Sequence, residues 1–252
     1  MAGVPHSEAA SRAAQVQAAI AQVRDPEIDE TVAALNFIVG TEIDGDAVTV
    51  TLRLPTFWCP ANFVFMMGGD IRDAVRALPW VRQFKFELID HFAADEISRS
   101  ITENRSFSKT FPNLAQKDLG DLRLTFDRKA FLMRQGALID FMRRNGFADD
   151  FLVHASVGDL RALAEAHGGT LAELALDYLA KREAIGLSIA ADDRAVTTPE
   201  GQAIAVAELQ THLREARKVT MSAQSNGEMC RILMSARLSG GPCALHSEKG
   251  NS

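Results

Sequence analysis

The sequence is poor in the residues that mark several large functional classes. It contains three cysteines, two tryptophans and one tyrosine among its 252 residues. Three cysteines are too few, and odd in number, for a disulfide framework, so we expect a reducing cytoplasmic setting in which thiols stay free. The scarcity of Trp and Tyr argues against a surface that stacks nucleic-acid bases.

A basic excess and a long apolar run are also missing. Lys and Arg number 27 against 33 Asp and Glu, a net charge of −6, whereas a general nucleic-acid binder usually carries a positive excess. The sequence has no stretch of about 20 apolar residues, and its start lacks the basic and apolar blocks of a secretory signal. It also contains no glycine-rich phosphate-binding loop. We therefore expect neither a nucleic-acid partner nor a membrane partner.

A regular alternation of apolar and polar residues stands out in the first third of the chain. It runs over residues 48–54 and again over residues 84–88, and a period of two is typical of strands with one buried face. An apolar, β-branched stretch at residues 37–43 precedes the first of them, across an Asp-Gly-Asp turn signal. Helical periodicity over residues 11–23 and 60–78 completes an α-β-β-α-β order, which predicts a small sandwich.

Helical patterns dominate after residue 94. The predicted fold class is therefore α+β, with an α-β-β-α-β sandwich domain over residues 1–98 and an all-α extension over residues 105–252. Residues 105–127 are expected to form an irregular connection. Thr170 and Glu173 resemble a capping box. The helices expected beyond the connection cover residues 128–145, 156–166, 170–184, 198–219 and 225–238.

Cys59 is the most informative single residue. It stands directly before Pro60, and proline favours the first position of a helix. We therefore expect Cys59 at the helix N-cap, where unpaired backbone N–H groups and the helix dipole favour a thiolate. Thr56, three residues upstream, is placed to share a hydrogen bond with the sulfur. The plainer interpretation is that Cys59 is a small buried hydrophobic residue.

Residues 15–92 resemble the iron–sulfur cluster assembly factor family that includes PaaD-like and SufT-like proteins. The resemblance rests on an Asp25-Pro26-Glu27 turn after the opening helix and a Thr56-x-x-Cys59-Pro60 step after the hairpin. The hairpin at residues 48–52, the helix end at 75–79 and the strand at 81–88 lie between and after these motifs in the family's order. The chain departs from the family at residues 32–40 and 90–92.

This resemblance implies a non-enzymatic maturation factor that delivers iron or an iron–sulfur cluster, held transiently, to a client metalloprotein. The family's active patch carries over to Cys59 and Asp25 as metal-binding residues, with Thr56 and Glu27 as neighbours. A thiolate and a carboxylate together can hold iron, and the carboxylate can take up the proton of the thiol. Because one thiol per site is a poor closed site, a homodimer is favoured.

The helical extension is similar to accessory proteins of propane-type binuclear-iron monooxygenases, which implies a helper in folding or metal loading. The alternative is a metal-free adaptor or assembly chaperone that binds an oxygenase subunit. A third hypothesis, a thiol-dependent enzyme, requires a histidine close to Cys59.

Other residues are weaker candidates. Cys230, Cys243 and His246 have a spacing that could place them on one metal ion, although Cys230 falls inside a predicted helix and could simply pack there. Phe63 and Met66 lie off the core stripe of the helix after Cys59. They predict a second apolar face, covered either by the extension or by a docked client or dimer partner.

Overall fold

The computed structural model describes residues 6–113 and 119–239. The chain forms two compact units. The first contains the chain up to Leu119 together with the segment from Ser225 onward, and the second is Gly120–Gln224. The first unit is thus discontinuous in sequence and extends beyond residue 98.

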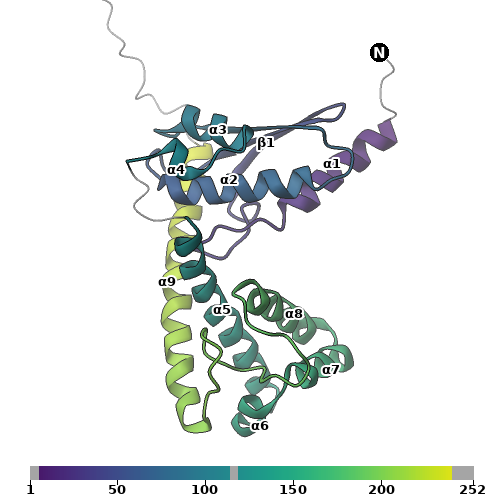
Figure 1. Cartoon of the computed structure of the whole chain (residues 1–252), viewed down its shortest axis with the longest axis vertical. Helices are drawn as coiled ribbons and strands as arrows, with labels where there is room; N and C mark the ends of the chain where they lie inside the picture. The colour runs from purple at the N-terminus through teal and green to yellow at the C-terminus, as the bar shows by residue number, and fades with distance from the viewer. Residues whose placement is uncertain (1–5, 114–118, 240–252) are drawn as a thin grey trace, which may run out of the picture. The chain divides into compact units, whose positions relative to one another are not determined.

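The first unit has the predicted α-β-β-α-β order, which confirms the α+β class. Two short helices follow the last strand, and the final part of the long helix α9 (Val206–Ser239) belongs to this unit. In chain order, its other elements are α1 (His6–Ile20), β1 (Ile38–Asp44), β2 (Ala47–Arg53), α2 (Ala61–Arg76), β3 (Gln83–Ile89), α3 (Ala94–Thr102) and α4 (Phe107–Thr110) (Figure 1).

The strands form one sheet in the order β1-β2-β3. β1 and β2 pair in antiparallel fashion, with Asp44 opposite Ala47, so that Gly45 and Asp46 form the predicted hairpin turn. Gly45 has a φ of 60°, a left-handed conformation that glycine adopts without strain. β2 and β3 are parallel, and a parallel pair needs a crossover, which α2 supplies.

The core of this unit follows the predicted alternation. Val48, Val50 and Leu52 of β2 are buried, whereas their sequence neighbours are more exposed. In β3, the buried side chains are likewise alternate ones, Phe84, Phe86 and Leu88. The α2 stripe packs on this face, with Val64 and Ile71 fully buried. On the second apolar face of α2, Met66 is 2% exposed and Phe63 packs partly buried against the core of the first unit. Phe65 packs edge-on against Phe107 of α4, with ring centroids 5.4 Å apart.

Gly68 sets how closely α2 approaches its neighbours. A Cβ atom at Gly68 would lie 3.0 Å from Phe86 Cζ and 3.2 Å from Ile101 Cγ1, whereas one at Gly69 would meet nothing within 4 Å. We expect Gly68→Ala to lower the free energy of unfolding by about 1–3 kcal/mol through overpacking. Gly69→Ala should instead raise it by up to about 1 kcal/mol, because alanine favours a helix. Urea denaturation of both variants tests this difference, and equal effects would contradict it.

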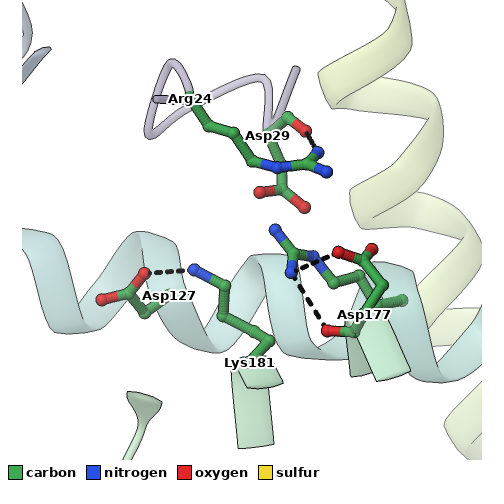
Figure 2. Close-up of polar contacts among 6 residues, drawn as sticks. Arg24, Asp29, Asp127, Asp177 and Lys181 are labelled. Atoms are coloured by element: carbon green, nitrogen blue, oxygen red, sulfur yellow. Dashed lines mark hydrogen bonds and ion pairs between the residues drawn. The ribbon is translucent and has the colours of Figure 1, made fainter. Parts of the chain in front are cut away.

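The second unit is helical throughout its described elements. It consists of the first part of α9 and of α5 (Leu119–Arg144), α6 (Asp149–His154), α7 (Val157–His167) and α8 (Gly169–Ala184). α5 ends as predicted at Gly146, which has a φ of 89° while Phe147 N donates to Met142 O. Such a left-handed glycine is typical of a helix C-terminus. The Lys181–Asp127 ion pair joins α8 to α5 at 2.8 Å (Figure 2).

A buried polar network holds the irregular segment between α8 and α9. Tyr178 Oη donates to Ala195 O at 2.6 Å, and Arg182 Nη1 donates to Ala195 O and to Thr197 Oγ1, both at 3.1 Å. Gln135 Nε2 donates to Thr197 O at 3.0 Å. Because each of these buried groups has hydrogen-bond partners, the network fixes this segment against the core of the second unit.

Several sequence-based helix boundaries are wrong. α5 begins inside the stretch expected to be irregular, and the helices expected over residues 198–219 and 225–238 are one helix, α9. Thr198-Pro199-Glu200-Gly201 forms a β-turn, with Gly201 N donating to Thr198 O at 2.9 Å, because Gly201 adopts a φ of 85°.

The N-cap of α8 is Gly168 with no side-chain cap. A capping box does occur, between Ser156 and Asp159 of α7.

In the part of the chain that the structure describes, no helix is long and apolar enough to cross a membrane.

Candidate thiol and carboxyl site

Asp25 organises the turn that ends the first helical region. Its Oδ1 accepts hydrogen bonds from Glu27 N at 2.9 Å and from Ile28 N at 3.0 Å. Asp25 N donates to Glu30 O, and an isolated bridge pairs Arg24 with Thr31. Arg24 Nη1 also donates to Asp29 O (Figure 2). The turn that the Asp-Pro-Glu sequence predicts is therefore a closed loop with the Asp25 carboxylate at its centre.

Burial makes the Asp25 carboxyl a weaker acid than usual. Asp25 is only 7% exposed, and this burial raises its pKa to about 6. The two backbone hydrogen bonds lower the pKa, but by less than burial raises it. The nearby charges of Glu27 and Glu30 raise the pKa further. Asp25 can therefore take up and release a proton close to neutral pH.

Cys59 lies in the loop between β2 and α2, and its side chain is half-buried. The expected hydrogen bond is present, with Thr56 Oγ1 and Cys59 Sγ 3.1 Å apart. The expected N-cap position is wrong, because the N-cap of α2 is Pro60. Pro60 accepts the first helical hydrogen bonds through its carbonyl group, from Phe63 N at 3.1 Å and Val64 N at 3.3 Å. Cys59 thus precedes the helix by one residue more than the sequence indicated.

His91 is a site residue that the sequence did not single out. It is buried, and its Nε2 lies 2.8 Å from Cys59 O while its Nδ1 accepts from Ala93 N at 3.2 Å. Because Nδ1 is an acceptor, the proton resides on Nε2, which donates to the Cys59 carbonyl. Desolvation lowers the pKa of His91, and the charge of Arg237 lowers it further, against the effect of the Cys59 hydrogen bond. His91 therefore holds the Cys59 backbone as a neutral imidazole.

Exposed aromatic side chains surround the Cys59 loop. Trp58 is 73% exposed, Phe92 is 52% exposed and Phe57 is 40% exposed. The Phe57 and Phe92 rings meet edge-on with centroids 6.5 Å apart, and Phe92 N donates to Phe57 O. Large apolar side chains gathered in the open mark surfaces that contact other molecules.

Cys230 comes from α9, far from the other site residues in sequence. Its thiol is half-buried against the core of the first unit. Burial raises its pKa to about 11, and the charges of Asp25, Cys59 and Glu27 raise it as well. Since all three charges act on one sulfur, the fold brings Asp25, Glu27, Cys59 and Cys230 into one neighbourhood, which we call the thiol–carboxyl patch.

Cys243 and His246, the other expected ligands near the C-terminus, lie outside the described residues. Within residues 6–113 and 119–239, no group of three or more His, Cys, Asp or Glu side chains is arranged to hold a metal ion. Asp25 and Cys59 as metal ligands, and Thr56 and Glu27 as their neighbours, therefore stay predictions.

Comparisons with known proteins support one part of the sequence interpretation. No curated protein and no solved structure matches this chain. A family model does match, and the matched stretch begins in α1, ends in β3, and includes both Asp25 and Cys59. Residues 13–85 are thus similar to the family described as iron–sulfur cluster assembly protein, which supports a role in that process.

Proposed function

We propose that this protein is a cytoplasmic maturation factor that binds iron or an iron–sulfur cluster transiently and passes it to a client metalloprotein. Cys59 would supply the thiolate ligand and Asp25 the carboxylate. The observation that carries this proposal is that the family match over residues 13–85 contains both residues. Both groups also lie close enough to Cys230 for their charges to raise the pKa of its thiol.

The chemistry of the two groups suits a transient metal site. A thiol must lose its proton to bind iron, and the proton needs an acceptor. With its pKa near 6, Asp25 is ionised at neutral pH and can accept the proton that leaves Cys59 Sγ, then release it to solvent before it binds the metal as a carboxylate. When the metal is handed on, a proton from solvent restores the thiol, so no proton is consumed over a full cycle.

The position of His91 argues against the alternative of a thiol-dependent enzyme. Such an enzyme needs a histidine nitrogen that takes the proton of the thiol. Both ring nitrogens of His91 are engaged by the backbone, at Cys59 O and Ala93 N. We therefore assign no turnover of a small substrate to this site.

The aromatic side chains beside Cys59 favour a protein as the recipient. Trp58 and Phe92 are more than half exposed, and aromatic residues are enriched where proteins bind one another. The PaaD-like or SufT-like subfamily, and a binuclear-iron monooxygenase as the client, are the finer assignments that the sequence resemblance suggests. A homodimer, in which two patches supply more ligands, is part of the same proposal.

Anaerobic reconstitution with Fe²⁺ and sulfide tests the proposal. We expect the wild-type chain to develop the visible absorbance of an iron–sulfur chromophore and to activate an apo-ferredoxin used as acceptor. Cys59→Ser nearly preserves the size of the side chain and can keep a hydrogen bond to Thr56. It should nevertheless lower the rate of iron transfer by about tenfold or more, the size of effect seen when a group at a metal site is mutated.

Cys243→Ser also removes one thiol, at a weaker candidate ligand, so comparing the two variants shows which thiol the transfer requires. Equal transfer by wild type and Cys59→Ser would remove Cys59 from the site. Absence of iron binding by the wild-type chain would favour the metal-free adaptor, a role for which the second unit, outside the family match, offers the surface.

A further inference from the structure

The last part of α9 packs on the first unit through a single helical face. Gly227 and Met234 are buried, Cys230 and Arg237 are half-buried, and the residues between them are mostly exposed. Their spacings of three, four and three residues place all four on one side of a helix. The segment Ser225–Ser239, which we call the α9 arm, lies outside the family match that ends at residue 85.

The arm makes close apolar contact with the first unit. Met234 is 1% exposed and is part of the hydrophobic core formed by the sheet, α2 and α3. Gly227 lies against the Asp25 turn, where an added Cβ would be 3.0 Å from Ile28 Cγ2 and 2.9 Å from Glu30 Oε1. The absence of a side chain at Gly227 therefore lets the helix approach the turn.

Two arginines add polar anchors on either side of Met234. Arg231 Nη1 pairs with Glu30 Oε2 at 2.5 Å. Arg237 donates to Leu54 O at 2.6 Å and to Asp90 O at 2.8 Å. Leu54 begins the loop that carries Cys59, and Asp90 immediately precedes His91, so Arg237 ties together the two segments that hold the Cys59 backbone.

We infer that the α9 arm is a displaceable cover of the thiol–carboxyl patch, anchored by Arg231 and Arg237, and that its release opens Cys59 to a client. The arm contacts the Asp25 turn at one end and the Cys59 loop at the other, and it carries Cys230 between these anchors. A cover of this kind limits reaction of Cys59 while no client is bound. The role of a client in this inference rests on the proposed function, whereas the covering of Cys59 by the arm does not.

Thiol modification of the full-length chain tests the cover without iron or client. In a Cys230→Ser/Cys243→Ser background, Cys59 is the remaining thiol of the three in the sequence, and its reaction with an aromatic disulfide reagent reports its exposure. Arg231→Gln combined with Arg237→Gln should raise the rate by about tenfold, because several charge-assisted contacts are lost. Gly227→Ala should raise it about threefold by crowding the Asp25 turn.

Two substitutions serve as matched controls. Arg217→Gln removes an arginine of the same helix that pairs with Asp140, and Gly69→Ala adds a methyl group where nothing lies within 4 Å. Both should leave the rate unchanged. In the anchor variants, the rate of Cys59 modification should also increase with urea concentration less steeply than it would if the whole protein had to unfold. The reason is that release of the arm exposes only a small surface.

Unchanged Cys59 reactivity in the folded anchor variant and in Gly227→Ala would overturn the cover. So would a urea dependence equal to that of global unfolding. If the paired arginine substitutions prevent folding, Gly227→Ala decides the question alone. This result is separable from iron transfer: failure here leaves Cys59 as a ligand, and failure of transfer leaves the cover in place.

Discussion

Asp25→Asn is expected to stabilise the protein at neutral pH while impairing iron handling. Asparagine retains an oxygen that can accept the hydrogen bonds of Glu27 N and Ile28 N, but it removes a buried negative charge. The raised pKa, about 6 against the ordinary value of 3.8, corresponds to an ionisation penalty of roughly 3 kcal/mol in the folded state. We expect a gain of about 1–3 kcal/mol, because the new amide N–H₂ must also find partners.

The pH dependence of this gain has a definite sign. The folded protein holds the Asp25 proton more tightly than the unfolded chain, so the penalty is absent below the unfolded pKa of 3.8 and complete above about 6. The stability of the wild type should therefore fall, through this group, as the pH rises across that window. The difference between Asp25→Asn and wild type should be largest at neutral pH and vanish near pH 4.

Denaturation by urea at several pH values measures this effect. Asp25→Ala removes the carboxyl oxygen as well as the charge and leaves two backbone N–H groups without their acceptor, so it should be less stable than Asp25→Asn by about 2 kcal/mol or more. Asp44→Asn, at the exposed last residue of β1, should change stability by no more than about 0.5 kcal/mol. A pH-independent difference for Asp25→Asn would show that the burial of this charge is not what limits stability.

Reduced iron transfer by the stabilised Asp25→Asn variant would show that the buried charge of Asp25, which costs stability, is needed for function. A buried carboxylate that costs stability is retained when it performs a task that a neutral amide cannot, such as binding a cation or accepting a proton. Full transfer activity in Asp25→Asn would exclude both tasks for Asp25.

Met234→Ala is expected to produce the largest loss of stability in the α9 arm. Met234 is 1% exposed within the core of the first unit, and truncation of such a side chain typically costs about 2–5 kcal/mol through lost burial and the remaining cavity. The loss should appear in urea denaturation and should also raise the reaction rate of Cys59, because the arm then lacks its most deeply buried apolar side chain.

Met229→Ala is the matched control for this substitution. Met229 lies on the same helix but is 56% exposed, so its truncation should change stability by no more than about 0.5 kcal/mol. Similar, small effects of the two substitutions would mean that the arm does not contribute to the core of the first unit.

The sequence by itself determined the parts of the protein that local patterns encode. The period-two runs of β2 and β3 fix which side chains are buried, and the turn residues Gly45 and Gly146 fix where elements end. The Asx-type turn at Asp25 and the Thr56–Cys59 contact join residues within three positions of each other. Such features depend on neighbours in the chain, so residue spacing was enough to predict the Thr56–Cys59 hydrogen bond.

Helix ends were less predictable because Pro and Gly signals compete with cooperative helix formation. Pro60 was expected inside α2 and is its N-cap, and Pro199 was expected to open a helix but lies in a turn closed by Gly201. The helical segments on either side of residues 220–224 merge into α9, because no strong breaker interrupts them.

The surroundings of Asp25 and Cys59 were decided by the tertiary structure. His91 reaches Cys59 O across 32 positions, and Arg231 reaches Glu30 across 201. No periodicity links residues so far apart, since their contact depends on the path of the whole chain and on the seating of Met234 in the core. The sequence therefore identified the thiol and the carboxylate, whereas only the folded chain brought the histidine, the second thiol and the α9 arm to them.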